Sequence, residues 1–231
     1  MPIILEEYID PQVFEKIRIF SENKETPFLV IDTETVNHQL ENLTGVFPYA
    51  SIYYAVKANP AIEILTLMKD KDINFDIASI YELDRVLSLG ISPDRISFGN
   101  TIKKSRDIRY FYEKGVRMYA TDSEADIRNL AKAAPGARIY VRILSEGTLT
   151  ADWPLSRKFG CQADMAMDLI ILAKDLGLIP YGLSFHVGSQ QRDIGAWDAA
   201  IGKVKVIFER LQEEVGIELK MINLGGGFPA N

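Results

Sequence analysis

The sequence NFDIASIYELDRVLSLGISPDRISFGN, residues 74–100, contains one complete repeat of the pattern that decides the fold. It opens on a short apolar run, NFDIAS (74–79), continues through YELDRVLSLG (81–90), and closes on a second apolar run, RISFGN (95–100). Short apolar runs of this kind are typical of strands buried on both faces. The middle segment has apolar residues at helical spacing. The stretch therefore predicts a strand, a helix and a strand in succession.

The same unit recurs along the chain. Apolar runs begin at residues 74, 95, 116 and 138, so they lie 21 or 22 residues apart. With the runs on either side they make seven predicted strands, at 51–56, 74–79, 95–100, 116–121, 138–143, 181–187 and 221–227. Helical periodicity fills the intervals, most clearly at 61–71, 81–90, 123–134 and 163–177. This alternation predicts an α/β fold with a parallel sheet.

The nearly constant unit length favours a closed TIM-type (β/α)8 barrel over a doubly wound sheet. A closed barrel needs eight strands, whereas the sequence stops four residues after its last glycine run. We therefore expect an incomplete barrel, truncated before the last strand.

Local signals support the helix boundaries. Ser79-x-x-Glu82 and Thr121-x-x-Glu124 both have the form of a capping box, which begins a helix. Glycines at 90, 115 and 177 stand where a helix ends in a left-handed residue.

Two stretches depart from the repeat. Residues 1–27 are expected to form an N-terminal helical segment around VFEKIRIFSEN (13–23), and residues 28–231 the barrel domain. FLVID (28–32) is predicted to be a strand outside the series. Residues 144–158 lack periodicity and follow the fifth barrel strand, at the rim where barrel enzymes place active-site loops, so they are a lid candidate.

Composition excludes several classes of protein. The formal net charge of −6 and the pI near 5.1 argue against a nucleic acid or an anionic membrane as partner. The single cysteine excludes an intrachain disulfide, and with two histidines it argues against a zinc cluster, so no metal site is expected. MPIILEEYID (1–10) is acidic where a signal peptide is basic, and no apolar stretch is long enough to span a membrane. We expect a cytoplasmic protein.

Lys57 is the first candidate for chemistry. It ends a predicted strand whose preceding residues, 53–56, are almost wholly apolar, and burial there would lower the pKa of its ammonium and provide the neutral amine that attacks a carbonyl. The alternative is a rim lysine that points into solvent.

Other candidates lie within or at the ends of other predicted strands. Gly225, Gly226 and Gly227 could aim backbone N–H groups at a phosphate, or form a flexible turn. His186 could stack on an aromatic cofactor with Ser189 beside a phosphate, or be a core histidine. Asp76 and Arg142 could support the site or form a structural ion pair. Glu82 fits its capping role, and Cys161 and His38 are expected to be structural or surface residues.

The motifs together resemble the alanine-racemase-like, fold-type III decarboxylases that use pyridoxal phosphate, above all ornithine, lysine and diaminopimelate decarboxylases. The resemblance rests on YAVKAN (54–59), FDIAS (75–79), HVGS (186–189) and GGGFP (225–229), with further likeness in FGNTIK (98–103) and SRKFG (156–160). It implies that Lys57 is the Schiff-base lysine and that His186 stacks on the cofactor ring. It also implies that Ser189 and Gly225 to Gly227 hold the phosphate, with Asp76, Glu82 and Arg142 in supporting roles.

The resemblance further implies decarboxylation of a basic amino acid in polyamine synthesis by a homodimer. GGGFP and HVGS favour ornithine, with putrescine as the product, over lysine and diaminopimelate. Complete members of the family continue into an eighth strand and a β-sandwich domain. Those parts carry the acid that pairs with the pyridine nitrogen and a cysteine that acts across the dimer interface. We therefore expect this chain to be a fragment with little activity alone.

Three other readings stay open. An antizyme-inhibitor-like protein would keep the fold and act through protein contacts. A pyridoxal-phosphate homeostasis protein would explain the short chain, although GGGFP and FDIAS fit it poorly. An alanine racemase is also a poor match.

Overall fold

A computed structural model describes residues 9–145, 151–153 and 159–229. The chain divides into two compact units, Met1–Ala50 and Ser51–Asn231. The boundary between them lies later in the chain than the one predicted after residue 27.

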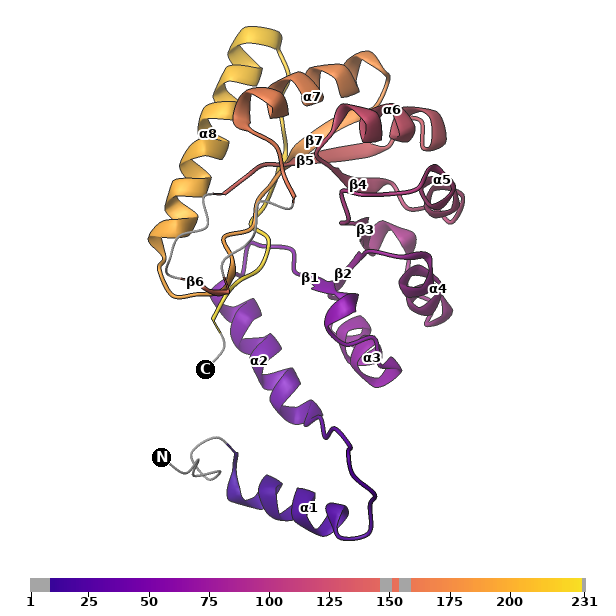
Figure 1. Ribbon diagram of the computed structural model, residues 1–231, viewed down its shortest axis with the longest axis vertical. Coiled ribbons are helices and arrows are strands. Elements are labelled where there is room, and N and C mark those ends of the chain that lie inside the picture. The colour runs from indigo at the N-terminus through magenta and orange to yellow at the C-terminus, as the bar shows by residue number, and fades with distance from the viewer. Residues whose placement is uncertain (1–8, 146–150, 154–158, 230–231) are drawn as a thin grey trace. The chain divides into compact units, whose positions relative to one another are not determined.

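The second unit is built on a seven-stranded parallel sheet (Figure 1). Its order is β1-β2-β3-β4-β5-β7-β9, which is the order of the chain. The strands are β1 (Tyr53–Ala55), β2 (Asn74–Ile77), β3 (Ile96–Phe98), β4 (Met118–Thr121), β5 (Arg138–Arg142), β7 (Ile179–Ser184) and β9 (Met221–Asn223). The seven predicted strands and the incomplete TIM-type barrel are thus confirmed.

Helices connect the strands and lie along one face of the sheet (Figure 1). They are α3 (Ile62–Asp70), α4 (Ile80–Ser88), α5 (Ser105–Glu113), α6 (Glu124–Ala133), α7 (Ala163–Asp175) and α8 (Gly195–Val215). Two single 3-10 turns, η2 (Val56–Ala58) and η3 (Pro93–Arg95), complete the connections. The glycines at 90, 115 and 177 all have positive φ, as helix ends require.

The core lies between the sheet and its helices. Phe75 and Ile77 of β2 are fully buried, and Phe98 of β3 stacks on Phe111 of α5 with ring centroids 3.9 Å apart. A buried phenylalanine contributes about 1.5–3 kcal/mol to stability. Because side chains alternate along a strand, Asp76 faces the other side of the sheet, which is the barrel interior.

One capping prediction is correct and the other is wrong. Ser79 caps α4, since its Oγ accepts the Glu82 N–H at 3.3 Å. The second box was predicted at Thr121, but Ser123 caps α6 by accepting the Asp126 N–H at 3.4 Å. Thr121 still belongs to β4 and pairs with Val141, so the chain has not yet left the sheet there.

A small second sheet stands at the site of the predicted irregular loop. β6 (Ala151–Trp153) pairs antiparallel with β8 (Ser189–Gln191). The rest of the lid candidate, 146–150 and 154–158, lies outside the described residues.

The described residues of the first unit, 9–50, form two helices, α1 (Pro11–Ser21) and α2 (Thr33–Val46). Asp10 and Asp32 cap them, each by accepting backbone N–H groups of the first turn. The strand predicted at residues 28–32 does not form in this structure. These residues have the composition of a strand, but no described segment pairs with them as a neighbouring strand. None of the described helices combines the length and apolarity that a membrane span needs.

Candidate functional site

Lys57 lies in the 3-10 turn η2, directly after β1, and is exposed. The Tyr54 hydroxyl donates to the Asn59 carbonyl at 3.1 Å, and the Asn59 side chain accepts the Ala61 N–H at 3.0 Å. These bonds fix the turn that carries the lysine. The expectation of a buried Lys57 is wrong, because the chain leaves the sheet at Ala55 and the lysine follows the strand instead of ending it.

Asp76 lies in the middle of β2, as predicted, with its carboxylate against the Cα of Gly99. A Cβ at Gly99 would overlap that carboxylate, so no larger residue fits there without moving Asp76. Burial raises the pKa of Asp76 to about 7. The positive charges of Lys57 and Arg142 oppose this rise, while Glu82 adds to it.

Glu82 has the structural role that its capping motif predicts. Its Oε2 accepts the Ala78 N–H at 2.6 Å, and its own N–H is held by Ser79. The carboxylate therefore closes the turn between β2 and α4 while it faces Asp76.

Arg142 ends β5, as predicted, and its guanidinium lies 5.3 Å from the centre of the Phe159 ring. Burial lowers the pKa of Arg142, and the negative charge of Asp122 is the main opposing effect. Arg142 and Asp76 influence each other through space but form no direct ion pair, so the simple structural pair is not present.

His186 lies two residues beyond β7, although the sequence predicted it within the strand. Its carbonyl accepts the Ser145 hydroxyl. Burial lowers the pKa of His186, and the charges of Arg142 and Lys57 lower it further, against a hydrogen bond with the Gly226 backbone. Its Nδ1 is buried with no hydrogen-bond partner in the described part of the chain.

The glycine run lies against the backbone that carries His186. Gly225 and Gly227 have φ of 71° and 93°. A Cβ at Gly225 would overlap the Phe185 carbonyl, and one at Gly227 would overlap the Gly188 carbonyl. Only glycine permits both the backbone conformation and this close approach.

Ser189 begins β8, beside the glycine run, and is exposed. Residues on either side of Ser189 interact with Gly227. The Gln191 N–H donates to the Gly227 carbonyl at 2.8 Å, and Gly188 touches Gly227. Of the SRKFG motif, residues 156–158 lie outside the described residues.

The structure places Cys161 and His38 in different surroundings. Cys161 is buried, and burial raises the pKa of its thiol to about 12. His38 is an exposed residue of α2.

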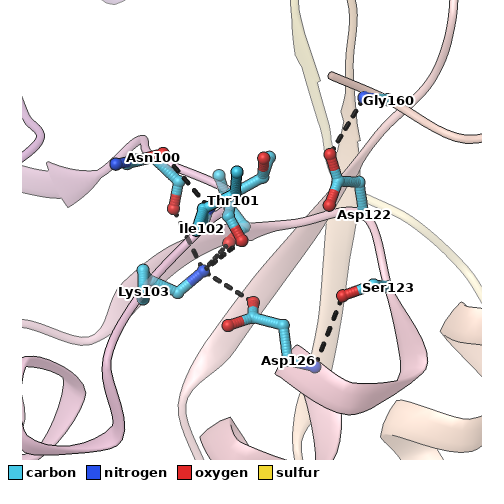
Figure 2. A network of polar contacts seen from close by, with 9 residues as sticks. Asn100, Thr101, Ile102, Lys103, Asp122, Ser123, Asp126 and Gly160 are labelled. Atoms are coloured by element: carbon cyan, nitrogen blue, oxygen red, sulfur yellow. Dashed lines mark hydrogen bonds and ion pairs between the residues drawn. The ribbon is translucent and has the colours of Figure 1, made fainter. Parts of the chain in front are cut away.

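Sequence reasoning missed two buried polar arrangements. The Tyr140 hydroxyl and Ser97 Oγ share a buried hydrogen bond of 2.9 Å inside the barrel. Lys103 and Asp126 form a buried ion pair of 2.6 Å (Figure 2). Lys103 stood in the FGNTIK motif, which marked the position, but its partner is 23 residues away and no local pattern indicates it.

The arrangement fits a flat aromatic cofactor with an aldehyde and a phosphate. Lys57 offers a reachable amine, and His186 a partly buried ring with an unused nitrogen. The glycine run leaves room that any Cβ would fill. The charges of Lys57 and Arg142 lie close enough to Asp76 and to His186 to lower the pKa of each.

Comparison with known proteins decides the family. Residues 33–231 match the family described as pyridoxal-dependent decarboxylase, pyridoxal binding domain. The chain belongs to this family. Its pyridoxal binding domain thus supplies the barrel, and pyridoxal phosphate is the cofactor of the pyridoxal-dependent decarboxylases.

Curated relatives of this decarboxylase domain agree. The lysine/ornithine decarboxylase of Selenomonas ruminantium is 34% identical over 93% of this chain and 54% of its own length. The ornithine decarboxylase of Saccharomyces cerevisiae is 34% identical over 99% of this chain and 51% of its own length. The chain thus spans about half the length of the curated relatives it matches.

A solved structure of the Selenomonas ruminantium lysine decarboxylase has the same fold. It superposes with a TM-score of 0.86 at 33% identity, over 94% of this chain and 56% of that one. Other relatives of the domain include an arginine decarboxylase of a Paramecium bursaria Chlorella virus and antizyme inhibitor 2 of Xenopus laevis.

Proposed function

We propose that the full-length protein decarboxylates a basic amino acid with pyridoxal phosphate, with Lys57 as the residue that bonds to the cofactor. The observation that carries the proposal is the convergence of Lys57, Asp76, Arg142 and His186 with the glycine run in a chain of this family. When bound, the cofactor supplies an electron sink for the bond that breaks at the substrate Cα.

Asp76 gives Lys57 a partner for proton transfer. Its pKa of about 7 means that the carboxyl can both accept and release a proton near neutral pH. The Lys57 amine must lose a proton before it can attack the cofactor's aldehyde. We assign Asp76 to hold that proton at its carboxylate, within the electrostatic reach of Lys57.

His186 is suited to stack on the cofactor ring. Because burial and the charge of Arg142 lower its pKa, the imidazole is neutral at pH 7. A neutral flat ring can lie against an aromatic face without bringing a charge into the site. The same lowering argues that His186 acts by orientation and not as an acid.

Ser189 and the glycine run are suited to hold the phosphate. Gly225 and Gly227 bring their backbone into contact with the segment that carries His186 and Ser189. Backbone N–H groups in such a bend, with a serine hydroxyl, form an anion-binding concavity. Arg142 adds a positive charge nearby.

Ornithine is the proposed substrate and lysine the next choice, with diaminopimelate third. The HVGS and GGGFP motifs support ornithine, and both lysine/ornithine and ornithine decarboxylases are among the relatives. We further propose a cytoplasmic homodimer that supplies putrescine for polyamine synthesis.

A regulatory protein without catalysis is the second candidate, since antizyme inhibitor 2 of Xenopus laevis is 31% identical over 87% of this chain. The retained lysine, histidine and glycines support the enzyme. The test is product formation by the full-length protein from L-ornithine, L-lysine, L-arginine and diaminopimelate, with the Lys57→Ala variant alongside. Putrescine as the main product, absent from the variant, supports the proposal. Cofactor uptake without turnover of any of the four would favour the regulatory protein.

A further inference from the structure

A fully buried lysine lies outside the residues assigned to the cofactor. Lys103 stands between β3 and α5, and its side chain is 0% exposed. Its Nζ donates to Asp126 Oδ2 at 2.6 Å and to the Ala120 carbonyl at 2.5 Å. The carbonyls of Asn100 and Thr101 lie 3.1 and 3.4 Å away (Figure 2). Four acceptors and no donor surround the Nζ, which is the environment of an ammonium.

The ammonium of Lys103 forms its ion pair with Asp126 and lies within electrostatic reach of Asp122. Burial lowers the pKa of Lys103 and raises that of Asp126, and each partner opposes the shift of the other. The charge of Asp122 acts on the pair through space, where it favours the charged lysine and disfavours the charge on Asp126. A buried ion pair is tolerated only when its hydrogen bonds are complete, and a network of this kind allows few alternative geometries.

Lys103 contacts both the end of β4 and the start of α6. It binds Ala120 in the strand and Asp126 in the first turn of α6, and Asp122 lies between them in the sequence. Figure 2 shows the carboxylate of Asp122 directed away from Lys103, toward Gly160. The position of Asp122 therefore depends on both anchors.

Asp122 in turn fixes the return segment, Gly160 and Cys161, which leads into α7. Its Oδ2 accepts the Gly160 N–H at 2.9 Å. Gly160 has a φ of 98°, and a Cβ there would lie 2.9 Å from the Ile143 carbonyl. The next residue, Cys161, donates its N–H to the Arg142 carbonyl at 3.0 Å. The return segment thus lies against the end of β5, where Arg142 stands.

The network reaches the proposed cofactor residues through Arg142. Burial lowers the pKa of Arg142, and the charge of Asp122 is the largest effect that opposes this lowering. Arg142 then acts on Asp76 and His186, whose pKa values its charge lowers. Lys103 touches none of these residues.

We infer that Lys103 is a positioning residue: with Asp126 it sets the end of β4 so that Asp122 holds Gly160, and through Cys161 the end of β5 that carries Arg142, beside the cofactor residues. The link to the cofactor rests on the proposed function. The link to Gly160 does not.

The first test is amide hydrogen exchange in the full-length protein without added cofactor. Lys103→Met leaves a buried carboxylate unpaired and can fail to fold, so the decisive variant is the double substitution K103M/D126L, which replaces the pair with apolar groups of similar size. Lys104→Met, at the exposed neighbouring lysine, is the matched control. Asp122→Ala removes the acceptor of Gly160, whereas Asp122→Asn keeps an oxygen that can accept.

The Gly160 amide is expected to exchange about tenfold faster or more in K103M/D126L and D122A. Amides of Ile139 and Val141 in β5 should keep their wild-type rates, and D122N and K104M should retain protection of Gly160. Wild-type exchange at Gly160 in K103M/D126L would overturn the inference. So would an equal acceleration of all amides, because that indicates only lower global stability.

The second test is the dissociation constant for pyridoxal phosphate in the same variants. We expect it to rise about fivefold or more in K103M/D126L and D122A but not in K104M. Unchanged affinity in a variant with an exposed Gly160 amide would overturn the link to the cofactor residues. If the wild-type protein takes up no pyridoxal phosphate, the proposed function fails, and hydrogen exchange alone decides the role of Lys103.

Discussion

Replacing Asp76 with asparagine should change how stability depends on pH. Burial raises the pKa of Asp76 from 3.8 to about 7 in the folded protein. Between these values the folded protein holds a proton that the unfolded chain has released, so the free energy of unfolding falls as pH rises. At about 1.4 kcal/mol for each pH unit, the total fall is on the order of 4 kcal/mol. Asparagine does not titrate and removes this fall.

The assay is urea unfolding of wild type and D76N at about pH 4.5 and about pH 7.5. The stability of D76N relative to wild type should improve by about 3 kcal/mol from the lower to the higher pH. Any pH-independent cost of the amide cancels in this comparison. Asp175→Asn, an exposed substitution on α7, controls for the loss of a carboxylate. A D76N difference that stays constant with pH would refute the account of Asp76.

Two further predictions concern the glycine run and the barrel interior. Gly227→Ala should cost about 2–4 kcal/mol and weaken pyridoxal phosphate binding, because it adds a clash with the Gly188 carbonyl to the strain of positive φ. Gly216 has a φ of 64° and open space around it, so Gly216→Ala should lower the free energy of unfolding by only about 1 kcal/mol and leave binding unchanged. Urea unfolding and cofactor titration would measure both effects. Equal losses of stability in the two variants would contradict the close approach at Gly227. Tyr140→Phe should cost about 1–2 kcal/mol by leaving the buried Ser97 hydroxyl unpaired, and adding Ser97→Ala should recover part of it. A double variant less stable than Y140F would contradict that pairing.

The repeat of apolar runs was enough to predict the sheet. Residues 74–79, 95–100, 116–121 and 138–143 contain β2 to β5, because strands buried on both faces need continuous apolar sequence. Strand ends were less predictable. β7 ends at Ser184, although the Phe185 N–H still donates to the Asn223 carbonyl. The carbonyl of His186 accepts the Ser145 hydroxyl instead of a strand N–H. That contact spans 41 residues and leaves no local signal.

The same limit applies to the site. Motifs located Lys57, His186 and the glycines, but the exposure of Lys57 depends on a 3-10 turn that the apolar run did not reveal. FLVID has the composition of a strand, yet a strand requires a partner, and none of the described segments provides one. The pairing of Lys103 with Asp126 joins the loop after β3 to the first turn of α6, which follows β4, and the pairing of β3 with β4 brings the two together. Sequence spacing predicts where the strands and helices lie. Contacts between these elements determine which charged side chains are buried and paired, and local sequence does not reveal them.

Reductive trapping tests the central claim most directly. The purified protein would be mixed with pyridoxal phosphate, reduced with borohydride and mapped by peptide mass. An adduct confined to Lys57, lost in the Lys57→Ala variant, is the predicted result. An adduct at another single lysine, or one scattered over exposed lysines in the full-length protein, would contradict the assignment of Lys57 as the residue that bonds to the cofactor.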